Sequence, residues 1–314
     1  MAGRRIRDHC RDRGPVDPAL HQHTSEEQVM GTENKTVAVI GAAGKMGQRV
    51  SNNLVKSDFR VLFSENSPQG QELIRGLGRE LTDSDEAAKQ ADVLILAVPD
   101  VVLGKVSELL VPLMKPGAVL LTLDPAAAYA GLLTRRDDVH NAVAHPCHPS
   151  VFLERTTKEE YADTFGGIAA PQEVVAAFEG PDASVQPLAE AVIRTMYAPV
   201  VDVHWVTVKQ LAVLEPTLVE TIACMVGALL TEALHETVHT VGVPEAAARA
   251  MLLGHTQVAL ANTLKGDNPF SDACLIAMDY GRESIVKDDW KKVFEDDELD
   301  KVITRMLRIK EIKR

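Results

Sequence analysis

Residues 37–50 read VAVIGAAGKMGQRV, and this stretch decides the fold of the chain. Its apolar run ends at Gly41, and Gly44 and Gly47 follow in the order G-x-x-G-x-x-G. A short buried strand that ends in a glycine turn and leads into a helix opens dinucleotide-binding α/β domains. Gly41 permits the tight turn, Gly44 lets the backbone approach a pyrophosphate, and Gly47 lets the helix pack closely on the sheet. We expect these glycines to bind a cofactor together with the backbone amides at the start of the helix, around Ala43, Lys45 and Met46.

Glu65 indicates which dinucleotide binds. It follows a second apolar strand, 60–64, roughly 20 residues after the glycine turn, where an acidic side chain accepts hydrogen bonds from the adenosine ribose hydroxyls. A carboxylate there repels a 2′-phosphate, so NAD is favoured over NADP, although Arg60 weakens the preference slightly. The alternative is a solvated glutamate beside a glycine turn used only for packing. A further strand ends in a loop that we expect to run beside the cofactor, Val98, Pro99 and Asp100.

Short apolar runs at 92–98, 118–123 and 141–144 alternate with helical segments or polar loops, which predicts a doubly wound, mostly parallel sheet of the Rossmann type. Two more strands, at 167–170 and 200–203, flank a helix near 185–196 and extend this domain. After residue 204 strand signals disappear and apolar residues recur at helical spacing. We expect a disordered extension at 1–34, an NAD-binding α/β domain at 35–204 and an all-helical domain for substrate binding and dimerisation at 205–314.

Composition restricts the partners. With 33 basic and 45 acidic residues the formal charge is −12, which disfavours nucleic acid. The apolar run 221–231 is far shorter than the roughly 20 residues that span a bilayer, so we expect no membrane segment. Four scattered cysteines fit a reducing cytoplasm. The helix from Leu218 to Val241 is too apolar to leave one face in water, so we expect a homodimer.

A competing zinc motif lies in the second half. Residues 235–239 spell H-E-x-x-H, and Gly242 with Glu245 extends the pattern, which taken alone indicates a metalloprotease. However, Pro244 is expected to open a new helix, so Glu245 becomes an ordinary first-turn acid. The cofactor motif is the stronger signal.

Three residues are candidates for catalysis. His145, in AHPCHPSVF after a predicted strand, can accept a hydroxyl proton or ligate a metal, and the alternative for it and for His148 is a structural role. Lys209 begins the helical domain, and Glu215 precedes Pro216, where the helix must kink or restart. A solvated helix face is the alternative for both. We expect His145, Lys209 and Glu215 to converge between the two domains beside the nicotinamide.

The order of a glycine-turn domain, a lysine-bearing helix and a helical domain resembles the 6-phosphogluconate and 3-hydroxyacid dehydrogenase superfamily over residues 35–314. Those enzymes usually place an asparagine four residues after the lysine, where this chain has Val213. The segments GAAGKMG, AHPCHPSVF and LEPTLVET are more similar to the branch with a phosphogluconate-dehydrogenase-type C-terminal domain, the D-apionate oxidoisomerase family.

That resemblance implies NAD-dependent oxidation of a small branched polyhydroxy acid coupled to isomerisation, formally related to ketol-acid reductoisomerase chemistry. A Lewis acid assists such a carbon shift, and His145 with Glu215 would bind a divalent ion such as zinc or magnesium. Two alternatives stay open. His145-Pro146 and Asp124 also resemble elements of prephenate and arogenate dehydrogenases, although Pro125 and the alanines after it replace the expected serine and lysine. The other alternative is a non-catalytic NAD-sensing protein.

Overall fold

The computed structural model describes residues 34–266 and 268–314, so the predicted extension lies outside the described residues except for Asn34. The described chain divides into two compact units. One extends to Leu218 and also contains 296–314, and the other is 219–295. The sequence analysis assigned everything after residue 204 to the helical domain. The last helix belongs instead with the sheet, because its apolar residues are buried in the core of the sheet unit, namely Leu299, Ile303 and Leu307.

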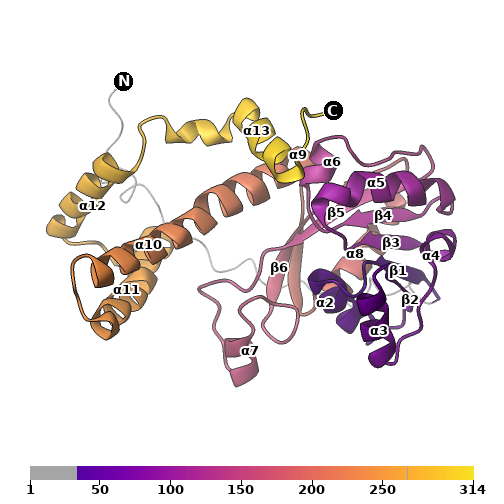
Figure 1. Ribbon diagram of the computed structural model, residues 1–314, viewed down its shortest axis with the longest axis horizontal. Coiled ribbons are helices and arrows are strands. Elements are labelled where there is room, and N and C mark those ends of the chain that lie inside the picture. The colour runs from indigo at the N-terminus through magenta and orange to yellow at the C-terminus, as the bar shows by residue number, and fades with distance from the viewer. Residues whose placement is uncertain (1–33, 267) are drawn as a thin grey trace. The chain divides into compact units, whose positions relative to one another are not determined.

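The first unit is built on a single sheet, whose strand order is β2-β1-β3-β4-β5-β6-β7 (Figure 1). Strands β1 to β5 are parallel, β6 is antiparallel to β5, and β7 is parallel to β6. The predicted doubly wound, mostly parallel sheet is therefore confirmed. The strands are β1 (Thr36–Ile40), β2 (Arg60–Ser64), β3 (Val93–Leu96), β4 (Val119–Thr122), β5 (His140–Pro146), β6 (Gln172–Glu179) and β7 (Val200–Trp205).

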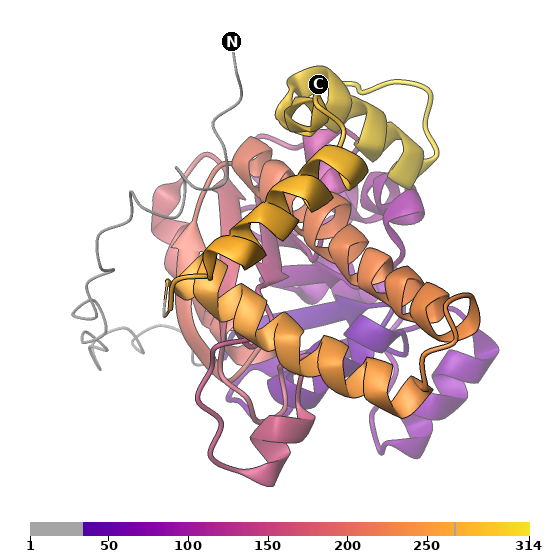
Figure 2. The same ribbon diagram turned by 90° about the vertical axis from the view of Figure 1, so that its left-hand side faces the viewer.

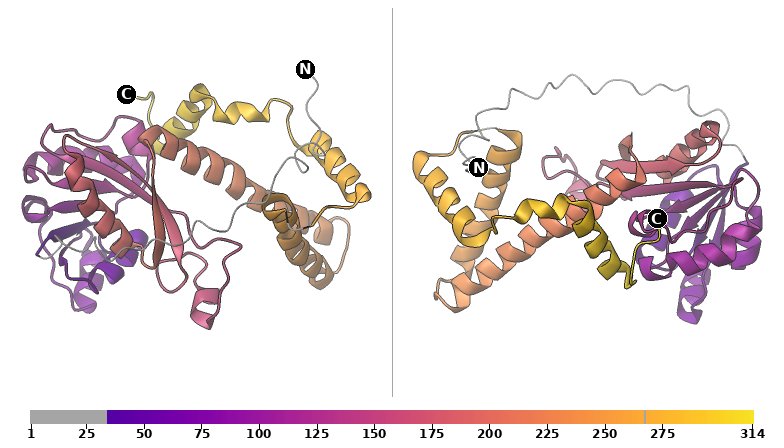
Figure 3. Two further views of the ribbon diagram at one scale, coloured as in Figure 1. Left: turned by 180° about the vertical axis from the view of Figure 1, so that it is seen from behind. Right: turned by 90° about the horizontal axis from the view of Figure 1, so that it is seen from above.

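Both faces of the sheet are covered by helices (Figure 3), which explains why its parallel strands are apolar without alternation. Val37 and Val39 of β1 face one layer, whereas Ala38 and Ile40 face the other. The first layer contains α2 (Lys45–Leu54), α3 (Pro68–Gly76) and α8 (Gln186–Met196). The second contains α4 (Ser84–Gln90), α5 (Asp100–Leu110), α6 (Ala126–Tyr129), α9 (Val208–Ala212) and α13 (Asp296–Leu307).

The sixth strand lies later in the chain than predicted. Residues 167–170 form a loop after α7 (Lys158–Ala162), and the strand begins at Gln172. Gly166 and Gly167 have positive φ angles of 79° and 82°, which a strand does not accommodate. The amides of residues 168–170 donate to the carboxylate of Asp163 instead of to a neighbouring strand.

The second unit contains three long helices, α10 (Met225–His239), α11 (Glu245–Leu260) and α12 (Asp272–Ile285) (Figure 2). Among the described residues of this unit, Ala248 is the one buried apolar side chain. A π-helical stretch, Val213–Cys224, connects α9 to α10, so that Val208–His239 is one continuous helix. By length and composition alone this helix could cross a membrane, whereas the sequence analysis expected no such segment. Leu211 and Ala212 near its start are buried in the sheet unit, whereas 17% of its most apolar window is buried.

Candidate functional site

The glycine turn is fixed to the end of β2. The amides of Gly41 and Ala42 both donate to the carbonyl oxygen of Ser64, at 2.9 and 3.1 Å. Gly41 has a φ of 80°, and a Cβ atom there would lie 2.6 Å from the carbonyl oxygen of Ala97. A Cβ on Gly47 would lie 2.0 Å from the oxygen of Gly41, so close helix packing requires glycine at this position. Gly44 is exposed, and a Cβ atom there would lie 3.3 Å from its nearest neighbour, the carbonyl oxygen of Gly41. The absence of a side chain at Gly44 leaves room on the outer face, where a pyrophosphate would approach.

Glu65 is held at the same turn by backbone amides. Its Oε2 accepts from the amide of Ala43 at 3.2 Å, and its Oε1 accepts from the amides of Asn66 and Ser67, each at 2.9 Å. Partial burial alone would raise the pKa of Glu65, but these hydrogen bonds lower it below the usual value. The side chain is therefore anionic at neutral pH, as discrimination against a 2′-phosphate requires.

The other predicted cofactor residues surround the turn. Lys45 and Met46 are the first residues of α2, and first-turn amides have no partner inside a helix. The Val98 side chain lies 2.9 Å from the position that a Cβ of Gly41 would take. Pro99 precedes α5, and Asp100 is its first residue, where burial raises the pKa of the carboxyl group. Because β3 pairs with β1, this loop lies beside the glycine turn.

A second cluster lies at the same edge of the sheet. One ligand atom each from Asp124, His145 and Glu215 lies within 4.8 Å of the others. Asp124 follows β4 and His145 is near the end of β5, and these adjacent strands are parallel, so their carboxyl ends meet. Glu215 comes from the π-helical stretch and is buried, with a relative exposure of 5%. The predicted pairing of His145 with Glu215 is present.

His145 is in the form that a metal ligand or a base requires. Its Nδ1 lies 3.1 Å from the carbonyl oxygen of Leu123, and a carbonyl oxygen only accepts, so Nδ1 carries the proton and Nε2 keeps its lone pair. Burial lowers the pKa of His145 to about 4, the bond to Leu123 acts in the opposite direction, and His148 lowers it further. The ring is neutral at physiological pH.

The donor set suits a divalent cation, since it combines two carboxylates with one neutral imidazole. Sequence reasoning did not include Asp124 in this site. The signal was present, because an acidic residue directly after a parallel strand stands where ligands gather in such sheets.

Lys209 and the H-E-x-x-H helix lie outside this cluster. Lys209 is exposed, and its Nζ donates to Asp296 Oδ2 at 2.6 Å, so the structure shows a surface ion pair instead of the predicted convergence with His145 and Glu215. The rings of His235 and His239 are 4.3 Å apart on an exposed part of α10. Within the described chain, no third metal-ligating side chain joins these two rings.

A glycine turn, an anionic residue at the end of β2 and a neutral histidine at the carboxyl edge of the sheet are the features of an NAD-dependent oxidoreductase. Two family models agree with this class. Residues 6–123 match the NAD binding domain of D-isomer specific 2-hydroxyacid dehydrogenases. Residues 153–307 match the C-terminal domain of phosphogluconate dehydrogenase (decarboxylating). The protein is an NAD-binding enzyme of the oxidoreductase class.

Similar proteins identify the family to which the chain belongs within this class of enzymes. A D-apionate oxidoisomerase from Pectobacterium atrosepticum is 60% identical over 286 residues, covering 91% of this chain and 100% of its own. Another from Cupriavidus necator is 42% identical over 275 residues, covering 86% and 98%. The crystal structure of a semialdehyde dehydrogenase NAD-binding protein from Cupriavidus necator, in complex with calcium and NAD, is 41% identical, with a TM-score of 0.84 over 87% of this chain and 99% of that one. The chain belongs to the D-apionate oxidoisomerase family.

Proposed function

We propose that this enzyme oxidises D-apionate with NAD and couples the oxidation to isomerisation of the carbon skeleton. The observation that carries the proposal is the convergence of Asp124, His145 and Glu215 at the carboxyl edge of the sheet that also bears the glycine turn. The identity of 60% to a D-apionate oxidoisomerase supports the choice of substrate.

The oxidation removes a hydride and a proton from a CH–OH group and leaves a carbonyl, and NAD supplies the hydride acceptor. The proton needs an acceptor near the hydroxyl, and the carboxylates of Asp124 and Glu215 each have a second oxygen that can accept it when the first oxygen binds a cation. The isomerisation then moves a carbon substituent to the neighbouring carbonyl carbon, without change in composition or oxidation level.

The same three side chains would hold a divalent cation such as magnesium or zinc, which would polarise a substrate oxygen. The related Cupriavidus necator structure contains calcium, which is consistent with a requirement for a divalent ion in the family. Lys209 is assigned no proton-transfer step, because it lies outside the cluster and is paired with Asp296.

Formation of NADH with D-apionate, recorded at the absorbance of the reduced nicotinamide, tests this function. The panel includes other branched and linear sugar acids and prephenate, each with and without EDTA. We expect turnover of D-apionate that Glu215→Gln reduces by at least 100-fold, while Glu220→Gln, an exposed position on the same helix, leaves it unchanged. NAD binding without NADH formation from D-apionate would overturn the proposal.

We further propose that the protein is a homodimer whose interface is the helical unit. Large apolar side chains are exposed on two of its helices, among them Met251, Leu253, Ile276 and Tyr280, each at least 60% exposed. With a single buried apolar side chain among its described residues, this unit cannot offset the conformational entropy lost on folding. A second copy of the chain would supply the missing core. We place the enzyme in the cytoplasm, since Cys147, Cys224 and Cys274 are unpaired thiols.

A further inference from the structure

His148 repeats the arrangement of His145. Its Nδ1 lies 2.8 Å from the carbonyl oxygen of Phe165, and its ring is 4.4 Å from the ring of Phe165, centroid to centroid. The carbonyl oxygen only accepts, so Nδ1 carries a proton. Within residues 34–266 and 268–314, Nε2 has no hydrogen-bond partner. The ring is half-buried and its centroid is 6.3 Å from that of His145, so its second nitrogen is available next to the Asp124–His145–Glu215 cluster.

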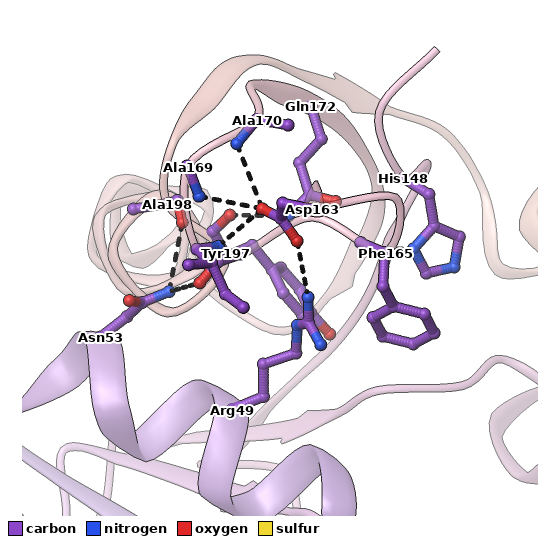
Figure 4. Close-up of polar contacts among 12 residues, drawn as sticks. Arg49, Asn53, His148, Asp163, Phe165, Ala169, Ala170, Gln172, Tyr197 and Ala198 are labelled. Atoms are coloured by element: carbon purple, nitrogen blue, oxygen red, sulfur yellow. Dashed lines mark hydrogen bonds and ion pairs between the residues drawn. The ribbon is translucent and has the colours of Figure 1, made fainter. Parts of the chain in front are cut away.

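The buried carboxylate of Asp163 ties the loop that carries Phe165 to helix α2 (Figure 4). Asp163 Oδ2 accepts from three consecutive amides at 3.0, 2.9 and 3.1 Å, and Oδ1 accepts from Arg49 at 3.2 Å. Asn53 donates to the carbonyl oxygens of Gly167, Met196 and Ala198. Arg49 and Asn53 both belong to α2, so the helix that starts at the cofactor turn anchors the loop that orients His148.

The ring of Phe165 ties this loop to the start of the same helix. The guanidinium of Arg49 lies 4.3 Å from the ring centroid and Lys45 Nζ lies 4.8 Å from it. Lys45 directly follows Gly44 of the turn. Ring contacts thus connect the cofactor turn, through Phe165 and His148, to His145 of the carboxylate cluster.

The backbone of His148 is also unusual. Its φ is 61°, a left-handed conformation that is uncommon for residues other than glycine, although asparagine, aspartate and histidine are enriched there. The bond to Phe165 and the ring contact hold the side chain in this conformation.

We propose that His148 is a substrate-binding residue, whose Nε2 forms a hydrogen bond with a hydroxyl group of the polyhydroxy acid. The inference rests on the proposed function and specifies how that substrate is recognised. Because Nδ1 is taken by Phe165, Nε2 is the ring nitrogen left for the substrate, and a hydroxyl group can pair with it as a donor or as an acceptor. His148 thus selects for a hydroxyl at one position of the substrate, beside the carbon that reacts.

Two substitutions separate the two nitrogens of His148. In His148→Asn, the amide group replaces Nδ1, keeps the donor to Phe165 and tolerates the left-handed backbone, but nothing reaches the position of Nε2. In His148→Gln, the longer side chain reaches that position. We expect His148→Asn to raise KM for D-apionate by roughly 10-fold or more, the effect of one lost hydrogen bond, with NAD affinity and Tm near the wild-type values. We expect His148→Gln to restore part of the loss, and His204→Asn, at an exposed histidine on β7, to behave as wild type.

Wild-type KM and kcat in His148→Asn would overturn the inference, because that variant lacks the Nε2 atom that the inference assigns to the substrate. A fall in NAD affinity and in Tm that accompanies the rise in KM would overturn it as well, because such changes would show that His148 stabilises the loop. A wild-type enzyme that does not turn over D-apionate contradicts the proposed function instead. Calorimetric titration of D-apionate into the protein with bound NADH then tests whether His148 binds the substrate. Binding weakened in His148→Asn supports it, whereas equal binding or no binding overturns it.

Discussion

Replacement of Asp163 by asparagine tests whether the buried carboxylate holds the loop to α2. The Asp163 side chain is 2% exposed and that of its partner Arg49 is 19% exposed. In Asp163→Asn, the amide oxygen can still face the three backbone amides, but the amide nitrogen then faces Arg49 and the ion pair is lost. Hydrogen bonds to a charged group are worth roughly 1.5–3 kcal/mol, against about 1 kcal/mol for neutral ones. With the ion pair broken as well, we expect a loss of about 3 kcal/mol in the free energy of unfolding.

The pH dependence of that loss identifies the carboxylate as its cause. Burial alone would raise the pKa of Asp163, but the amides of Ala169, Ile168 and Ala170 and the charge of Arg49 lower it below 3.8. A carboxyl group whose pKa is lowered by folding stabilises the protein above its unfolded pKa. That contribution disappears as the pH falls through the folded value. The difference between wild type and Asp163→Asn should be complete at pH 7 and shrink below about pH 4.

Thermal unfolding followed by circular dichroism at pH 7, 5 and 3.5 measures the difference. A loss of about 3 kcal/mol corresponds to a decrease in Tm of roughly 6–12 °C. Asp138→Asn is the matched control, since Asp138 pairs with Arg136 at an exposed position, where solvent screens the pair. The reasoning fails if Asp163→Asn changes Tm no more than the control at pH 7, or if its effect is the same at pH 3.5.

Three further changes probe the cofactor site and the helical unit. Glu65→Gln should reduce discrimination against NADP by roughly 100-fold. The reason is that the Glu65 carboxylate and a 2′-phosphate about 5 Å away repel by about 3 kcal/mol at an effective dielectric constant near 20. Wild-type protein that binds NADP as tightly as NAD in a fluorescence titration contradicts this. Gly47→Ala should weaken NAD binding at least 10-fold, since the new Cβ would lie 2.0 Å from a backbone oxygen, whereas Gly76→Ala, with nothing within 4 Å, should not. Equal affinities in these two variants would show that close packing at Gly47 is not required. Light scattering at micromolar concentration should give the mass of a dimer, which Ile276→Asp should reduce, and a monomeric wild type would rule out the proposed interface.

The arrangement of the sheet was largely predictable, because each parallel strand is a short apolar run buried on both faces. β6 was misplaced because the run at 167–170 was judged by side-chain type, while its amides are taken by Asp163. Asp163 is itself paired with Arg49 of α2, more than 100 residues earlier, and nothing local in the sequence reveals that ion pair. The position of α13 was missed for a related reason, since its apolar face does not indicate which unit it covers.

The two metal patterns in this chain show what spacing can and cannot predict. His235 and His239 are one turn apart on a helix, so their proximity follows from sequence alone, yet no acidic third ligand joins them among the described residues. Asp124, His145 and Glu215 have no regular spacing, and they meet because two parallel strands end side by side and an irregular helix brings a buried glutamate to them. A local motif specifies two ligands at most. A complete site requires the topology, so acidic and imidazole side chains at the carboxyl ends of neighbouring parallel strands are better evidence for a site than the motif on α10.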